Sequence, residues 1–318
     1  MSLDTRKKQA GSFSYGEFVW WFGVVEDRMD PKELGRVRVR VLGYHTADLG
    51  KIPKDKLFWA IPVLPITGAS ISGYGWSPTG MFEGTHVFGF FVDGHDGQMP
   101  MVVGTILGIP KDKKAWPSDG EGFNDPNEKY PEYPLGEIDT NRTCTNRKIS
   151  ETHVQKRRDL EDKNVESAFG VTWSEKTTPY AAKYPYNHVR HTESGHVEEF
   201  DDTEGKERYL LWHRTKTFRE IHDDGSTVHK IVKDSYEIVM GDDYVHIMGN
   251  CTVTIDGDSH LRVKGNANIE IDGNCREHIH GNYKLNVDGN YDVQINGHHY
   301  SNSDTHTKFT APRIDLNP

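Results

Sequence analysis

Glycine recurs every eight residues through the C-terminal part of the chain, without a slip in register. The glycines are Gly241, Gly249, Gly257, Gly265, Gly273, Gly281, Gly289 and Gly297. A valine or isoleucine stands two residues before each glycine, most octads carry a second apolar residue two positions earlier, and Asn or Asp usually follows the glycine. A short internal period of this kind constrains the architecture more than any other sequence feature.

One octad buries too little apolar surface to fold by itself. Alternation places its two apolar residues on one face of a short strand, and glycine followed by Asn or Asp permits positive φ, so the chain can turn a corner. Burying two such side chains contributes roughly 3–6 kcal/mol, whereas ordering eight residues costs roughly 8–16 kcal/mol in backbone entropy. We therefore expect three chains to share one axis, with a single-chain solenoid as the alternative.

The predicted spike domain, residues 237–318, is a trimeric prism: an intertwined, triple-stranded β-helix. Its expected core consists of β-branched residues two places before the glycines. These trimer-core residues are Ile247, Ile255, Val263, Ile271, Ile279, Val287 and Ile295. Glu277 occupies an apolar position of the repeat, where three carboxylates would meet, and is expected to widen the prism locally.

The N-terminal part is also predicted to be β-structured, which makes the fold class all-β. Residues 15–110 contain five strand patterns between Gly, Pro and Asp turns, as expected for a small OB-fold barrel. Within them Arg36, Arg38 and Arg40 alternate with valines. This alternation predicts one outward basic stripe, which is either solvated or in contact with a partner.

Two segments connect the barrel to the spike. Residues 111–186 are polar and show little periodicity, and they are interpreted as an extended linker with one short helix near 150–162 that wraps the surface of neighbouring modules. Residues 187–236 contain further strand patterns and form a β-rich segment that leads into the spike.

The composition narrows the functional classes. The formal net charge is −10, and three chains with about −30 would repel nucleic-acid backbones and anionic lipid head groups. No stretch approaches the roughly 18 apolar residues of a membrane span, and the N-terminus has no secretory signal pattern. The three cysteines form neither a disulfide framework nor a zinc motif. We expect a soluble protein made in a cytosol, with no nucleic-acid partner.

Candidate chemistry is sparse. His298, His299 and His306 lie near the C-terminal tip, where the repeat loosens, and are the candidate ligands of an axial metal ion. His278 and His280 flank an inward-facing isoleucine and are expected to point outward. No nucleophile elbow and no recognisable pair of glycosidase carboxylates occurs, so no catalytic residue and no other cofactor is predicted.

The order of the segments is similar to that of a known family. WWFGVVEDRMDPKELGRVRVRVLGYH (20–45) and PITGASISGYGWSPTGMFEGTHVFGFFVD (65–93) resemble the OB domain of the baseplate central spike proteins of T-even-like contractile-tailed phages. SGHVEEFDDTEGKERYLLWHRTKTFREIHDDGS (194–226) resembles the segment that leads into their β-helix, a motif shared with type VI secretion spikes. The octads and the closing TAPRIDLNP (310–318) complete the resemblance.

The resemblance implies a homotrimeric, cell-puncturing spike in the virion tail baseplate, assembled in the host cytoplasm, that pierces the host envelope during tail contraction. Its implied partners are a baseplate hub protein at the OB domain, a PAAR-repeat tip protein at the C-terminal end and, transiently, the host membrane. Phe309, Ile314 and Leu316 are the expected contacts of the tip protein.

The family's type member carries a lysozyme domain between its barrel and its β-helix, and residues 111–186 are too few and too polar for such a domain. The resemblance therefore implies a mechanical, non-enzymatic protein. The alternatives are a spike of the type VI secretion kind and a tail-associated peptidoglycan hydrolase.

Overall fold

The computed structural model describes residues 19–107 and 140–314, and the chain divides into two units, residues 1–254 and 255–318. Regular structure in the described residues is almost entirely β, with a few short helices, so the predicted all-β fold class is confirmed. Among the described residues no helix is long and apolar enough to cross a membrane.

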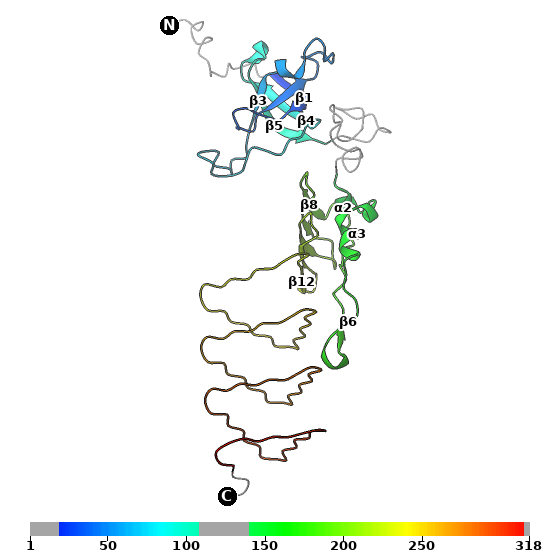
Figure 1. The fold of residues 1–318 in the computed structure, drawn as a ribbon. Helices are drawn as coiled ribbons and strands as arrows, with labels where there is room; N and C mark the ends of the chain where they lie inside the picture. Colours follow the sequence, from blue (N-terminus) through cyan, green and yellow to red (C-terminus); the bar gives the residue numbers. More distant parts are fainter. Residues whose placement is uncertain (1–18, 108–139, 315–318) are drawn as a thin grey trace. The chain divides into compact units, whose positions relative to one another are not determined.

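Five strands close into a barrel near the N-terminus (Figure 1). They are β1 (Val19–Asp27), β2 (Val37–Val41), β3 (Trp59–Pro62), β4 (His86–Phe91) and β5 (Pro100–Ile106). The order around the barrel is β1-β2-β3-β5-β4, and all pairs are antiparallel except β3 with β5. The connections contain the 3-10 turns η2 (Lys54–Lys56) and η3 (Gly94–Asp96). The predicted five-stranded OB-type barrel is confirmed.

Alternate residues of these strands fill the interior of the barrel. The three valines of β2 are buried together, as their alternation predicted, and pack in one cluster with Trp21. Gly89 of β4 passes so close to its neighbours that a Cβ there would lie 1.9 Å from the Met101 carbonyl oxygen and 2.6 Å from the Trp21 ring. Only glycine fits this position, because any side chain would separate two strands of the closed barrel.

Arg36 and the two arginines of β2 do not form the outward basic stripe that the sequence predicted. Arg40 is buried, and its guanidinium donates hydrogen bonds to both carboxylate oxygens of Glu26, at 2.5 and 3.0 Å. Arg36 makes a similar forked pair with Asp30, at 2.5 and 3.0 Å, and holds the pKa of that carboxyl well below its usual range. These guanidinium groups meet carboxylates of β1 and the following turn, so their charge is neutralised within the barrel.

A five-stranded antiparallel meander forms a second sheet. Its strands are β8 (Asn187–His191), β9 (Val197–Asp201), β10 (Arg208–Trp212), β11 (Phe218–Ile221) and β12 (Thr227–Lys230), in the order β12-β11-β10-β9-β8. Gly225, with a φ of +80°, occupies the turn between β11 and β12, where glycine adopts left-handed backbone without strain.

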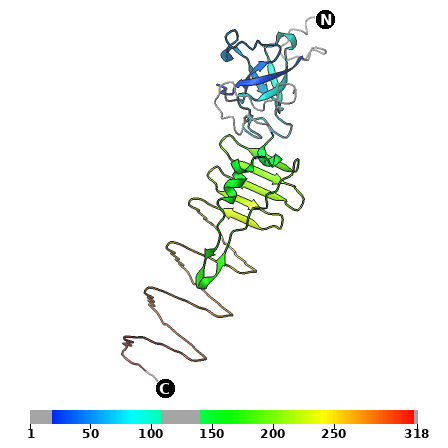
Figure 2. The same ribbon diagram turned by 90° about the vertical axis from the view of Figure 1, so that its right-hand side faces the viewer.

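The described residues between 140 and 186 form a packed layer with more regular structure than the extended linker that the sequence predicted, and α3 lies where the one short helix was expected. The layer contains α2 (Arg142–Thr145), η4 (Ile149–Glu151), α3 (His153–Arg158), β6 (Val165–Glu166), η5 (Ala168–Gly170) and β7 (Thr172–Trp173). Figures 1 and 2 both place α2 and α3 beside the β8–β12 sheet. Residues 111–139 of the predicted linker lie outside the described residues.

The octads form no hydrogen-bonded strand in the described single chain. In the second unit the chain winds as an open coil of extended passes (Figure 1). A bend occurs at each octad glycine together with the residue before it, as the corner-turning repeat predicted. The bends keep this period to Asp304–Thr305, one octad beyond the predicted last unit at Gly297.

Candidate assembly surface

The apolar face of the octads is exposed in a single chain. The predicted trimer-core residues have these exposed fractions: Ile247 52%, Ile255 56%, Val263 50%, Ile271 53%, Ile279 44%, Val287 45% and Ile295 46%. The apolar residues two positions earlier are more exposed still, up to 90% at Leu261. Monomeric soluble proteins rarely leave so long a row of apolar side chains in water, so this face is suited to contact with another chain.

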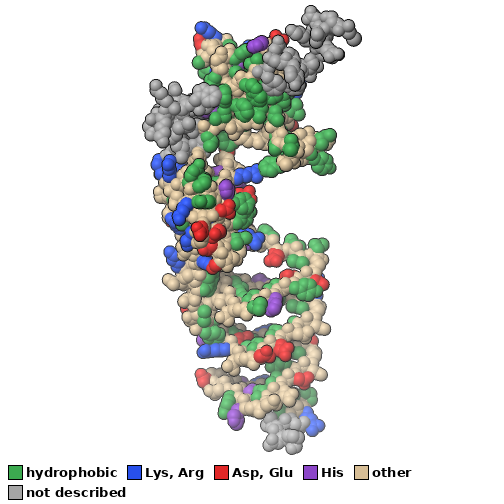
Figure 3. Space-filling model, turned by 180° about the vertical axis from the view of Figure 1, so that it is seen from behind, with side chains coloured by type: hydrophobic (Ala, Val, Ile, Leu, Met, Phe, Trp, Pro, Cys, Tyr) green, Lys and Arg blue, Asp and Glu red, His purple; other side chains and the backbone are tan. Residues whose placement is uncertain are grey.

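The backbone of the octads lacks partners as well. Within the described residues 231–314, no backbone N–H group donates to a backbone carbonyl. Figure 3 shows open space between successive passes of the coil. Extended backbone with a free row of N–H and C=O groups is a template for pairing with strands of other chains.

The octad glycines also indicate that this part of the chain contacts another chain. None of the eight has a positive φ, so the expectation of left-handed backbone at the corners is wrong. A Cβ at any of them would meet no atom of the described chain within 4 Å. Neither the backbone conformation nor packing within one chain requires glycine here. Close approach by another backbone is the physical reason that remains.

The predicted tip residues are only partly placed. Phe309 and Ile314 are exposed apolar side chains near the C-terminal end, whereas Leu316 lies outside the described residues. The His298 ring lies 5.8 Å from the Tyr300 ring.

The candidate metal ligands do not converge within one chain. The backbone N–H of His306 donates to the Ser303 hydroxyl at 3.3 Å. Nowhere in the described ranges do three or more His, Cys, Asp or Glu side chains gather in a way that could hold a metal ion. His298, His299 and His306 therefore stay predicted ligands, of a site that more than one chain would have to complete.

A buried ionic cluster joins the helical layer to the β8–β12 sheet. Glu199 of β9 and Glu220 of β11 are fully buried on the two strands that flank β10. Arg208 of β10 pairs with Glu199 and donates to Glu220 Oε1 at 3.2 Å. From α3, His153 pairs with Glu199, and Arg157 donates to Glu220 Oε2 at 3.2 Å.

The charges of this cluster keep both carboxylates ionised. Burial alone raises the pKa of a carboxyl, but Arg208 and His153 outweigh it and lower the pKa of Glu199 to about 2. The pKa of Glu220 is also lowered against the effect of burial, by Arg208, by the Thr178 hydroxyl that donates at 2.6 Å, and by Arg157. The cluster acts as a structural clamp, since every charge in it is met by a fixed partner.

Sequence reasoning recognised the strands of this sheet but missed the cluster. Arg208 stands in phase with Leu210 and Trp212 along β10, and Glu220 stands in phase with Phe218 along β11. A charged residue at a buried position of a strand must be paired. That in-phase pattern was the available signal, and it pointed to ion pairs between neighbouring strands such as Arg208 with Glu220.

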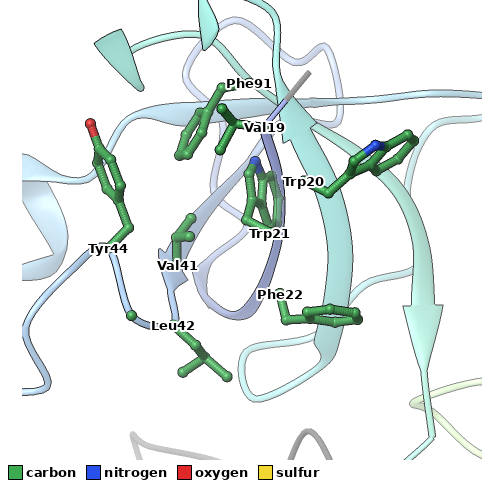
Figure 4. Close-up of a pocket in the computed structure, with 9 residues that line it drawn as sticks. Val19, Trp20, Trp21, Phe22, Val41, Leu42, Tyr44 and Phe91 are labelled. Carbon is green, nitrogen blue, oxygen red and sulfur yellow. The ribbon is translucent and has the colours of Figure 1, made fainter. Parts of the chain in front are cut away.

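The barrel has an apolar hollow at one rim. It has a volume of about 560 Å³ and is lined by Val19, Trp20, Trp21, Phe22, Val41, Leu42, Gly43, Tyr44 and Phe91. In Figure 4, Trp21 turns toward Val41 and Phe91, while Trp20 turns to the other side of β1. The Tyr44 ring lies 5.0 Å from the Phe91 ring. This lining offers mainly hydrophobic contact, and its polar side-chain groups are the Tyr44 hydroxyl and the indole N–H groups of Trp20 and Trp21.

Comparison with known proteins gives two family matches and two relatives. The Gp5 N-terminal OB domain matches residues 44–185, and the bacteriophage T4 gp5 C-terminal trimerisation domain matches residues 196–295. Protein Gp5 of Vibrio phage KVP40 is 42% identical over 269 residues, which cover 74% of this chain and 63% of that protein. The pre-baseplate central spike protein Gp5 of Enterobacteria phage T4 is 49% identical over 117 residues, covering 35% of this chain and 20% of that protein.

A barrel of the OB type followed by an octad trimerisation domain defines a structural β-protein that assembles through its C-terminal coil. The two domain matches cover most of the chain, in the order in which the structure shows the modules. The chain therefore carries two Gp5 domains, the N-terminal OB domain and the C-terminal trimerisation domain, and is similar to Gp5 proteins over both. It spans 63% of the length of its KVP40 relative.

Proposed function

We propose that this chain is the structural central spike of a phage tail baseplate, a homotrimeric needle that pierces the host envelope during tail contraction. One observation carries the proposal: the octads expose apolar faces, unpaired backbone and corner glycines that a single chain leaves without partners. Three interwound chains would satisfy all of these at once. The trimerisation-domain match and the names of the relatives support it.

The proposed mechanism is mechanical stiffness. In a triple-stranded β-helix each strand is hydrogen-bonded to strands of other chains, so unfolding requires the separation of all three. Such a fibre has a high unfolding barrier, and kinetic stability is the property that a puncturing device needs. The working site is the virion tail baseplate, after assembly in the host cytoplasm, and contact with the host membrane is transient.

The proposed protein partners bind at the two ends of the chain. The loop between β3 and β4 exposes Ile66, Ile71, Tyr74 and Trp76. We assign this loop as the contact of the OB domain with a baseplate hub protein, because clustered exposed apolar side chains are typical of protein interfaces. At the other end, Phe309 and Ile314 are the proposed contacts of a PAAR-repeat tip protein.

The proposed role requires neither catalysis nor a cofactor. The matched families describe an OB domain and a trimerisation domain, and neither description names an activity. Zymography of the purified protein on peptidoglycan tests this point, and clear lysis would establish a hydrolase. Elemental analysis of the intact assembly tests the candidate axial metal at His298, His299 and His306.

Replacing Ile271 with Asp tests the assembly and its function together. Three carboxylates at a predicted trimer-core position, with no cation to pair with them, should abolish SDS-resistant trimers. Phage supplied only with the I271D spike should then fail to infect. The measurements are unheated SDS gels and plaque counts.

The matched control is Thr254→Asp, which introduces the same carboxylate at a position expected to face outward. This variant should keep both the trimer and infectivity. The proposed function is wrong if I271D spikes lose their trimers and still support infection, because a needle then has no role in entry.

A further inference from the structure

The outer face changes in charge from one octad to the next over five consecutive octads, those that end at Gly257, Gly265, Gly273, Gly281 and Gly289. We define an outer pair as the residues three and one positions before each octad glycine, because the positions four and two before it carry the apolar face. The successive outer pairs are Thr254/Asp256, Arg262/Lys264, Glu270/Asp272, His278/His280 and Asn286/Asp288. Their formal charges are therefore negative, positive, negative, neutral for the unprotonated histidine pair, and negative.

These charges have no electrostatic partner within the described chain. The side chains of Arg262, Lys264, Glu270 and Asp272 are exposed, and none of them forms an ion pair within the described residues. Arg262 with Lys264, and Glu270 with Asp272, also place two like charges on the same face of one short strand, which is unfavourable in isolation. The rings of His278 and His280 lie 4.3 Å from each other. A neighbouring strand of opposite charge would compensate these charges.

Symmetry fixes which strand that neighbour is. The chain bends once per octad, and the simplest threefold coil with one corner per octad has three sides. Three octads then complete one turn, and each octad rises by one strand spacing, about 4.8 Å. Rotating the chain by a third of a turn places the next octad of a second chain directly beside each octad of the first. Residue i of one chain therefore lies beside residue i+8 of another.

We propose that the outer pairs from Asp256 to Asp288 form an interchain charge ladder that sets the register of the three chains. Arg262 and Lys264 of one chain face Glu270 and Asp272 of the next, and Lys264 also faces Asp256 on its other side. The partner that this surface fits is a second copy of the same chain. The proposal rests on the trimer proposed above.

The charge pattern favours this stagger over its competitors. With no stagger, Arg262 would lie beside Arg262 and Asp272 beside Asp272. With a stagger of two octads, Asp256 would lie beside Asp272, and Asp272 beside Asp288. Both arrangements place like charges on adjacent strands, which is destabilising. A one-octad stagger brings opposite charges together, and the histidine pair extends the ladder whenever its imidazoles are protonated.

Cysteine crosslinking of the full-length protein tests the stagger. In a background with all three native cysteines replaced by serine, Asp272→Cys with His280→Cys places thiols on adjacent strands of different chains. Their Cα atoms would be about 4.8 Å apart, within the disulfide range of about 4.4–6.8 Å. Mild oxidation should convert the protein into covalent trimers on reducing-agent-free, boiled SDS gels.

Two controls make the crosslinking decisive. Asp272→Cys with Asp288→Cys separates the thiols by two strand spacings, roughly 10 Å, and should give no covalent trimer. Asp272→Cys alone should give no crosslinked chains. Crosslinking by the single variant, or failure of the 272/280 pair in a protein whose native mass is trimeric, overturns the ladder and leaves the trimer standing. A monomeric native mass overturns the proposed function itself.

Charge reversal tests whether the ladder contributes to stability. Glu270→Lys with Asp272→Lys places lysines beside Arg262 and Lys264, and the heat resistance of the trimer should be lost. Adding Arg262→Glu and Lys264→Glu should restore a substantial part of it. Asp243→Lys with Asp258→Lys makes the same change of net charge at corner positions and should leave the trimer intact. Equal loss in both reversed proteins, or no rescue, contradicts a specific ladder.

Discussion

Glu199 and Glu220 carry negative charge where solvent does not reach them, and each is held by an arginine and by a group from the helical layer. Desolvation of a buried charge is costly, so this arrangement persists only while every partner is present. At the scale of single residues, a few buried charged side chains therefore help to attach the layer to the sheet.

Removing one charge from this cluster should be strongly destabilising. Glu199→Gln leaves Arg208 and His153 buried beside a neutral amide, and a loss of about 3–5 kcal/mol is expected. The matched control is Glu198→Gln on the other face of β9, where a change within about 1 kcal/mol is expected. The thermal unfolding midpoint of the full-length protein measures both, and equal midpoints for the two variants would contradict the assigned role.

The depressed pKa of Glu199 also predicts acid sensitivity with a definite sign. A carboxyl whose pKa falls from 4.5 to about 2 on folding stabilises the protein fully above pH 4.5. That contribution is lost as the pH falls from about 4.5 toward 2. Unfolding midpoints recorded across this window should fall more steeply for the wild type than for E199Q. Parallel curves would show that Glu199 titrates normally.

At the scale of elements, the sequence predicted the strands and bends that follow a periodic residue pattern. The strands of the barrel and of the second sheet follow alternating patterns, and the octad bends follow the glycines. The layer between 140 and 186 was interpreted as a linker with one short helix because its attachment uses ion pairs such as Arg157 with Glu220, and these leave no periodic apolar signal. Arg40 was interpreted as an outward-facing residue because alternation shows on which face of the strand a residue lies. Alternation does not show that the Glu26 carboxylate lies on that same face.

The octad glycines allow a sharp test at this scale. Gly273→Val introduces a β-branched residue that extended backbone favours, and within one chain its Cβ would meet nothing within 4 Å. A single-chain coil should tolerate the change. An interwound trimer should not, because another backbone passes close to the glycine, so heat-resistant trimers should be lost. Ser259→Val, at a position off the octad glycines, is the control, and equal tolerance of both changes would count against interchain packing at the corners.

At the scale of the whole molecule, low apolar content and an exposed octad coil have one common explanation. The hydrophobic fraction of 35% is low for a chain of 318 residues that builds a large core of its own. A core shared between three chains removes the difficulty, since each octad then buries its apolar face against two copies of itself. The candidate site is therefore a surface that is incomplete in one chain, which is why the repeat predicted its residues while the single chain leaves them exposed.

The native mass of the purified full-length protein tests this central claim most directly. Three chains of 36.2 kDa give about 109 kDa, and native mass spectrometry or light scattering at micromolar concentration should return that value. The same mass should persist after dilution, since interwound chains cannot separate without unfolding. A monodisperse particle of 36.2 kDa would contradict the trimeric needle and would favour a coil closed by one chain.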